Sequence, residues 1–195
     1  GGGTDLLVQL KSGRRDASLV VDLKRIPELM TIAMEEGGLR LGAAAPCIRI
    51  ARHADVRTLY PSLAELASLI GGTAIQGRAS IGGNLCNAAP SADSVPLLIA
   101  LSAVARVAGP AGLREIAVEE FCVAPGRNAL GAGEFLVDLL IPRPAAGFRA
   151  HYLRFIPRNE MDIAVVGVGA SATVVDGRIT AARLALASVA PTPRR

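Results

Sequence analysis

The sequence has few cysteines and histidines, which excludes several kinds of site. Its three cysteines, Cys47, Cys86 and Cys122, lie far apart and form no CxxC pair, so neither a disulfide framework nor a thiolate metal site is indicated. We expect each to be a small buried residue in a reducing compartment. The two histidines, His53 and His151, are also far apart and belong to no cluster with metal-ligand spacing.

Aromatic residues are scarce as well, at 3% of the chain, although the net charge is +4 and the pI is about 9.4. Most of this charge comes from scattered arginines, and there are few rings on which nucleotide bases could stack. Nucleic-acid binding is therefore disfavoured. A small anionic ligand, bound by backbone amides and a few arginines, fits the composition better.

Long apolar runs are missing too. No stretch reaches the roughly 18 residues that a membrane helix needs, and the first residues do not resemble a secretion signal, so we expect a soluble, cytoplasmic chain with no membrane partner. With 195 residues, 51% of them hydrophobic, the chain is long enough to bury a sizeable core. It opens inside a glycine turn at Gly1 and closes at Pro191–Arg195 after a strand-like run, which predicts truncation at both ends.

Glycine and small polar residues are concentrated between Gly71 and Asp93, where the sequence reads GGTAIQGRASIGGNLCNAAPSAD. The first five residues, GGGTD, form a second loop of this kind. Glycine lets a backbone approach a phosphate closely, and successive amides can donate to its oxygens. The two loops are thus candidates for one diphosphate site, with donors from residues 80–84 and 2–5, although each also fits an ordinary tight turn.

Asp93 has two interpretations of equal weight. Its carboxylate could accept a hydrogen bond from a ligand hydroxyl, or it could cap the helix expected directly after it.

Hydrophobic periodicity and turn residues predict an α+β fold. We expect helices over residues 4–11, 48–59, 62–70 and 94–101, a helical turn at 27–29, and strands over 19–23, 39–43, 103–108, 113–118, 135–142, 150–156, 163–175 and 178–189. Thr4 or Asp5 is the expected cap of the first helix, and Asp176-Gly177 strongly indicates a hairpin. After residues 143–149 the expected elements are mostly long strands, and this change predicts a boundary between two domains there.

The run AIQGRASIGGNLCNAAPSADSVPLLIAL resembles the flavin-loop signature of the molybdenum hydroxylase FAD subunits, approximately IRNxATIGGNxxxASPxSDxxPxLLAL. This is the family of the carbon monoxide dehydrogenase medium subunit and of the xanthine dehydrogenase FAD domain. GGGTDLL is similar to the family's AGGTDLL, residues 134–142 to its E-L-L-x-x-I-x-I-P strand, and residues 152–155 with 162–166 to the opening of its C-terminal domain. The resemblance covers the whole chain.

The implied fold is an α+β FAD-binding domain of two α/β subdomains over residues 1–145, lacking its usual N-terminal strand-helix unit. A small, incomplete C-terminal sheet-and-helix domain over 146–195 follows. The implied cofactor is FAD. The implied cofactor-binding residues of the two diphosphate loops are Gly2, Gly3, Thr4 and Asp5 in the first, and Ala79, Ser80, Ile81, Gly82, Gly83 and Asn84 in the second.

The resemblance assigns five more residues to the flavin site. Asp93 matches an acidic residue at the flavin, and Ile70, Gly71 and Ile75 match positions near the adenine or the ribityl chain. Arg154 stands where the family usually has a lysine close to the isoalloxazine, and a positive charge there favours a reduced, anionic flavin.

The sequence also departs from the family pattern. Residues 74–78 read AIQGR in place of Q-I-R-N-x, Ser80 replaces a threonine and keeps the hydroxyl, and Ala92 replaces a serine and removes one. The change at residues 74–78 removes an Arg and an Asn from one turn of the expected FAD site.

The implied function is electron transfer, with no acid–base chemistry and no catalytic residue in this chain. Electrons would come from a molybdopterin centre on a large subunit through two-iron, two-sulfur clusters on a small subunit, and FAD would pass them to NAD or another acceptor. A flavin-free module that only docks onto partner subunits is the alternative. A flavoprotein of the enolpyruvyl-sugar reductase type is a weaker one, because Gly82-Gly83-Asn84 together with Asp93 argues against it.

Overall fold

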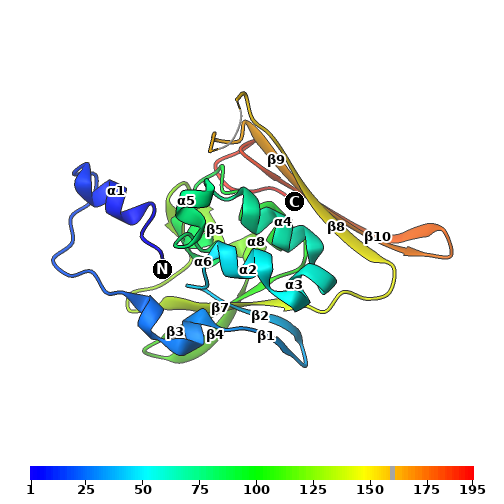
Figure 1. The fold of residues 1–195 in the computed structure, drawn as a ribbon, viewed down its shortest axis with the longest axis horizontal. Coiled ribbons are helices and arrows are strands. Elements are labelled where there is room, and N and C mark those ends of the chain that lie inside the picture. The colour runs from blue at the N-terminus through cyan, green and yellow to red at the C-terminus, as the bar shows by residue number, and fades with distance from the viewer. Residues whose placement is uncertain (159–160) are drawn as a thin grey trace.

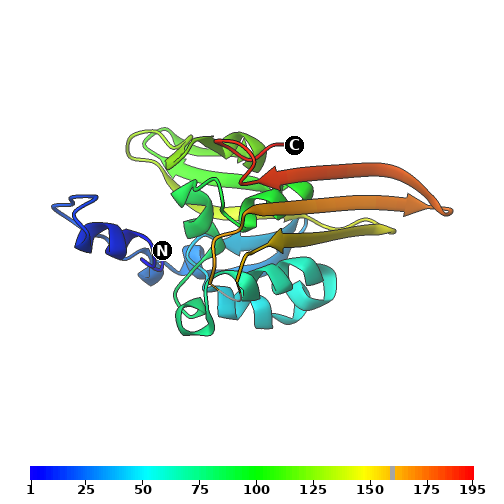
Figure 2. The same ribbon diagram turned by 90° about the horizontal axis from the view of Figure 1, so that it is seen from above.

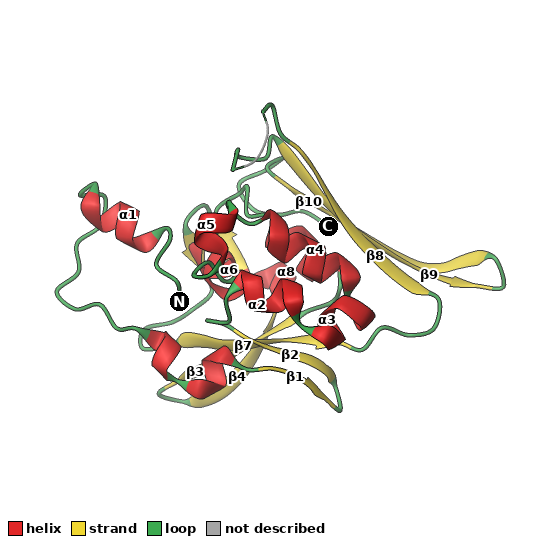
Figure 3. Ribbon diagram, viewed as in Figure 1, coloured by secondary structure: helices red, strands yellow, loops and turns green. Residues whose placement is uncertain are grey.

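The computed structural model describes residues 1–158 and 161–195 and contains two main antiparallel sheets with helices between and beside them (Figures 1 and 3). The five-stranded sheet has the order β1-β2-β7-β3-β4, and the three-stranded sheet has the order β10-β9-β8. The strands are β1 (Ile32–Glu35), β2 (Gly38–Gly42), β3 (Val104–Gly109), β4 (Gly112–Ala117), β5 (Cys122–Ala124), β6 (Arg127–Asn128), β7 (Phe135–Pro142), β8 (Phe148–Phe155), β9 (Val166–Val175) and β10 (Arg178–Ala187).

The α-helices are short, namely α1 (Leu6–Lys11), α2 (Cys47–Arg52), α3 (Ala54–Leu59), α4 (Pro61–Leu69), α5 (Thr73–Gln76), α6 (Ile81–Asn87), α7 (Ser94–Ala100) and α8 (Val118–Phe121). Of these, α6 and α8 contact the five-stranded sheet, whereas α7 and α4 contact the three-stranded sheet. Two 3₁₀ turns, η1 (Leu23–Arg25) and η2 (Pro27–Met30), precede β1. No helix in the described part of the chain is long and apolar enough to cross a membrane.

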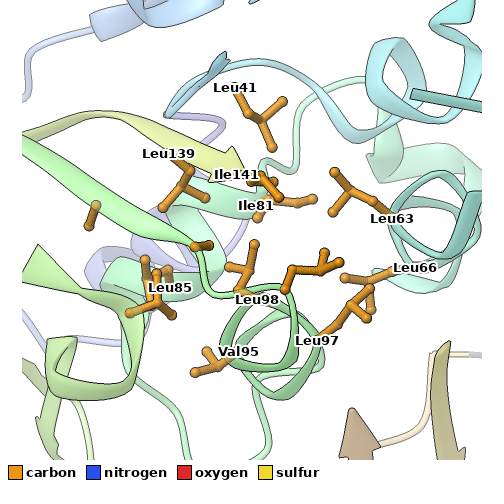
Figure 4. Close-up of a cluster of buried hydrophobic side chains, with 14 of the residues drawn as sticks. Leu41, Leu63, Leu66, Ile81, Leu85, Val95, Leu97, Leu98, Leu139 and Ile141 are labelled. Carbon is orange, nitrogen blue, oxygen red and sulfur yellow. The ribbon is translucent and has the colours of Figure 1, made fainter. Parts of the chain in front are cut away.

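Helix α7 is the centre of the core, since all of its residues are buried. Figure 4 shows Leu97 and Leu98 of α7 among side chains from α4, α6, β2 and β7. The three-stranded sheet packs on α7 as well. A Cβ at Gly169 of β9 would meet the Pro96 backbone, so glycine allows this sheet to approach the helix directly.

Two parts of the chain extend away from this core (Figure 2). The N-terminal segment, which includes α1, lies on one side, and the β9–β10 hairpin projects on the other. The hairpin turn at Asp176-Gly177 has the positive φ angles of 50° and 75° that its sequence predicts.

Most expected elements are confirmed, two expectations are wrong, and one strand was not predicted. Residues 19–23 form no strand, because Leu19, Val20 and Val21 lie exposed along the N-terminal segment and do not pair with the sheet. Strand β1 was not predicted. The glycine-rich stretch is also not a continuous loop, because it contains α5 and α6.

Candidate functional site

The two glycine-rich loops meet in the structure. A Cβ on Gly2 would overlap the backbone carbonyl of Arg78, and one on Gly1 would lie 3.1 Å from the Ser80 Oγ atom. Gly3 has a φ of +79°, a conformation that favours glycine. The first loop therefore lies directly on the start of the second, and its glycines are what permit the contact.

A cavity of about 400 Å³ opens where the loops meet. It is bounded by the first loop and α1, the residues before η1, and the first turns of α6. The lining residues are Gly1, Gly2, Gly3, Thr4, Asp5, Leu6, Leu7, Gln9, Arg15, Val20, Val21, Asp22, Lys24, Ile70, Arg78, Ala79, Ser80, Gly83, Asn84, Cys86 and Asn87.

Ser80 begins α6 as its N-cap. Its Oγ atom accepts a hydrogen bond from the Gly83 amide at 3.0 Å, which fixes the first turn of the helix. Because this oxygen acts as an acceptor, the hydroxyl proton remains available to a ligand in the cavity. The capped turn thus brings the Ser80 hydroxyl and the Gly83 backbone to the same wall.

The two neighbouring glycines of α6 have different roles. A Cβ on Gly82 would collide with the backbone of Ala43, so Gly82 is required for packing against the segment after β2. A Cβ on Gly83 would meet only Ser80 Oγ, at 2.9 Å, and Gly83 lines the cavity. Gly83 is thus the glycine that keeps the wall open to a ligand.

The Asn84 side chain is held in place by hydrogen bonds from Ser94. Its Oδ1 atom accepts hydrogen bonds from the backbone amide and the hydroxyl of Ser94 at 3.2 and 2.6 Å. No partner for its Nδ2 atom is present among the described residues, so this donor is free for a ligand.

The charged side chains at the cavity are three bases and two acids, namely Arg15, Lys24, Arg78, Asp5 and Asp22. Lys24 Nζ donates to Asp22 Oδ1 at 2.6 Å, and this hydrogen bond holds the pKa of the Asp22 carboxyl below its usual range. With that pair neutralised, Arg15 and Arg78 outweigh Asp5, a balance that favours an anionic ligand.

Cys86 lies at the cavity and is only half-buried, whereas Cys47 and Cys122 are buried in the core as predicted. Burial raises the pKa of the Cys86 thiol to about 12, so it stays protonated at neutral pH. The described residues contain no group of three or more potential metal ligands.

Asp93 stands at the N-cap position of α7, but its side chain makes no capping hydrogen bond, so the capping interpretation of its carboxylate is wrong. Its Oδ1 atom accepts a hydrogen bond from the Tyr152 hydroxyl at 2.6 Å, and its Oδ2 atom accepts one from Arg154 Nη1 at 3.1 Å. Burial and the hydrogen bond to Asp93 raise the pKa of Tyr152, which therefore remains a donor. This buried cluster joins β8 to the residue before α7.

The structure separates the predicted site residues into two groups. Those that line the cavity are Gly2, Gly3, Thr4, Asp5, Ile70, Ala79, Ser80, Gly83 and Asn84. Those that do not line it are Gly71, Ile75, Ile81, Gly82, Asp93 and Arg154. Within the second group Gly71 lies against Ile75, Ile81 and Gly82 are buried, and Asp93 pairs with Arg154.

Sequence reasoning missed the wall formed by the residues before η1. Val20, Val21, Asp22 and Lys24 reach the cavity through the fold of a long irregular segment. Their strand-like pattern predicted burial in a sheet, and no local signal indicated a cavity. The contact of Gly2 with Arg78 and the hydrogen bond from Gln9 to Asn87 hold the N-terminal segment beside α6.

The arrangement suits a dinucleotide bound through its diphosphate. Two glycine-lined loops, the donors of Thr4, Ser80 and Asn84, and an excess of basic side chains face one cavity. Leu6, Leu7, Val20 and Val21 add apolar surface at the N-terminal wall. The residues present thus fit the adenosine diphosphate half of FAD.

Comparison with known proteins gives the class. The family described as "FAD binding domain in molybdopterin dehydrogenase" matches residues 1–144, and the "CO dehydrogenase flavoprotein C-terminal domain" matches residues 151–195. The chain therefore belongs to the FAD-binding subunits of the molybdopterin dehydrogenases, which are oxidoreductases, and its cofactor is FAD.

Individual relatives agree with this assignment. The xanthine dehydrogenase FAD-binding subunit of Escherichia coli O157:H7 is 33% identical over all of this chain and 67% of its own length. The nicotinate dehydrogenase FAD-subunit of Eubacterium barkeri is 29% identical over 91% of this chain and 61% of its own. This chain thus spans about two thirds of the length of these two curated relatives.

The fold is shared with solved structures. A carbon monoxide dehydrogenase structure from Hydrogenophaga pseudoflava superposes with a TM-score of 0.95 at 30% identity, covering all of this chain and 68% of that chain. The predicted α+β class is confirmed by this likeness.

Proposed function

We propose that this chain carries FAD within a molybdenum-containing hydroxylase and relays electrons between partner subunits. The partners would be a large molybdopterin subunit and a small two-iron, two-sulfur subunit, and the final acceptor would be NAD or another oxidant. Bound FAD supplies the redox chemistry. The residues of this chain bind and orient the cofactor, and the location would be cytoplasmic.

The observation that carries this proposal is the contact of the two glycine loops around one cavity. Gly2 lies against the Arg78 carbonyl, and Gly83 presents an open wall beside the Ser80 hydroxyl. A diphosphate between them would accept hydrogen bonds from both loops. The cavity-lining residues named above are the proposed contacts of the adenosine diphosphate half.

Of the predicted residues that do not line the cavity, Asp93 and Arg154 would belong to the flavin half. Gly71 and Ile75 would lie near the adenine or the ribityl chain. Ile70 lines the cavity, Gly71 follows it in sequence, and a Cβ on Gly71 would meet the Ile75 side chain. Asp93 and Arg154 would lie at the isoalloxazine, and Arg154 would place a positive charge there. Residues 1–145 would form the FAD-binding domain and residues 146–195 the start of a second domain, with the boundary between β7 and β8.

Gly83→Val tests the cavity. The added side chain would point into the space proposed for the diphosphate, while the fold has no backbone contact to lose there. We expect FAD binding, measured by quenching of flavin fluorescence, to be abolished while the circular dichroism spectrum is retained.

Gly77→Val is the matched control, because a Cβ at Gly77 meets nothing within 4 Å and Gly77 does not line the cavity. It should bind FAD as the unchanged protein does. Unchanged FAD affinity in Gly83→Val would refute the site. Absence of FAD binding by the unchanged protein at micromolar FAD would instead point to the flavin-free docking module.

A further inference from the structure

A chain of hydrogen bonds runs from the C-terminal sheet to the cavity wall. It begins at Tyr152 on β8, which is 3% exposed and whose hydroxyl donates to Asp93 Oδ1 at 2.6 Å. Tyr152 itself does not line the cavity. Its side chain is directed at the loop between α6 and α7, which are the helices on either side of Asp93.

The next step crosses one peptide bond. Ser94 follows Asp93, and both its backbone amide and its hydroxyl donate to Asn84 Oδ1. The Ser94 amide is always a donor, so the Asn84 atom facing it must be the oxygen. The amide nitrogen of Asn84 must then face the other way, toward the cavity that Asn84 lines.

Tyr152 is held rigidly at the start of this chain. A Cβ on Gly167 of β9 would collide with the Tyr152 hydroxyl, so the absence of a side chain there makes room for the ring. Two residues along the same strand, Gly169 packs on the Pro96 backbone at the first turn of α7. The sheet and α7 therefore fix both ends of the Tyr152–Asp93 bond.

We propose that Tyr152 is a positioning residue for the cofactor cavity, which acts through Asp93 and Ser94 to orient the Asn84 side-chain amide. This inference rests on the proposed function. Without the Tyr152 hydroxyl, Asp93 keeps only its bond to Arg154 and becomes more mobile. Ser94, the next residue, then becomes more mobile too, so the Asn84 side chain is no longer held by a fixed partner. The effect would reach a ligand's diphosphate although Tyr152 does not line the cavity.

The raised pKa of Tyr152 agrees with this role, because the hydroxyl remains a protonated donor throughout the neutral range.

The test is a double-mutant cycle between Tyr152→Phe and Asn84→Ala, with dissociation constants measured for FAD by fluorescence quenching and for ADP by calorimetry. ADP probes the diphosphate half alone. We expect Tyr152→Phe to weaken both ligands by the same factor of about five, the size expected for one hydrogen bond. In the Asn84→Ala background the same substitution should have no further effect on FAD affinity.

Arg149→Gln is the control on the same strand, since among the described residues the Arg149 guanidinium bonds only to the Phe148 carbonyl. It should leave both affinities unchanged. Thermal unfolding without ligand shows that each variant is folded at the assay temperature.

Three results would overturn the proposal. They are unchanged affinity for both ligands in Tyr152→Phe, loss of FAD affinity with ADP affinity unchanged, and an equal loss in the presence and absence of Asn84→Ala. The second would mean that Tyr152 acts at the flavin, and the third that it acts only on general stability. Failure of the proposed function would look different, because the unchanged protein would then bind neither ligand.

Discussion

The two glycine-rich loops that enclose the cavity have similar compositions but very different support. The second loop leads into α6, whose Ile81 and Leu85 are at most 1% exposed and pack in the main core. The first loop leads into α1, which has no buried residue, and its Val8 is 63% exposed. The N-terminal segment therefore packs against the second loop and makes few contacts with the core.

This difference shows that a sequence motif and its stability have separate causes. The second loop is formed before any ligand arrives, because burial and a helix cap hold it. The first loop is tied to the body by the Gly2 contact with Arg78 and by a 3.5 Å hydrogen bond from Gln9 to Asn87. A ligand that bridges the loops would contribute much of the ordering of this segment.

The largest expected difference in stability between the two loops comes from a pair of leucine-to-alanine substitutions, one beside each loop. Leu85→Ala should lower the free energy of unfolding by about 3 kcal/mol, because it leaves a cavity in the core. Leu7→Ala in α1 should change it by less than about 0.5 kcal/mol, because Leu7 is 46% exposed. Urea denaturation without FAD measures both values, and similar losses would show that α1 is part of the core.

A smaller difference in stability is expected between alanine substitutions at the two glycines of α6. Gly82→Ala should cost about 2 kcal/mol, because the new methyl would lie 2.8 Å from the Ala43 methyl and closer still to its backbone. Gly83→Ala should be near neutral, since the gain in helix propensity offsets a shift of Ser80 Oγ. Equal losses in thermal stability would mean that Gly83 also has a packing role.

The smallest expected effect concerns the two helix caps. Ser80→Ala should cost about 1 kcal/mol of stability by removing the bond to the Gly83 amide. Asp5→Ala should cost much less, because Asp5 is the N-cap of α1 but its side chain makes no capping bond. Chemical denaturation of the FAD-free protein compares them, and a larger loss for Asp5→Ala would reverse the comparison of the two loops.

Much of the fold is predictable because its signals are local. The spacing of Leu63, Leu66 and Ile70 predicts α4, and Asp176-Gly177 predicts the β9–β10 hairpin, since periodicity and turn chemistry depend on neighbours in sequence. The wrong strand at 19–23 has the opposite cause. Its β-branched residues favour a strand, but only a neighbouring strand could satisfy its backbone, and the N-terminal segment lies away from the sheets.

The site divides in the same way. By itself the sequence indicated a candidate diphosphate site at the two glycine loops, because glycine lets a backbone approach a phosphate, and its resemblance to known motifs indicated an FAD-binding family. Only the tertiary structure decided that Gly83 faces the cavity while Gly82 packs on Ala43. It also decided that the Asp93 carboxylate accepts from Tyr152 and makes no capping bond to α7. Those outcomes depend on which distant segments come into contact, and the local sequence does not predict such long-range contacts.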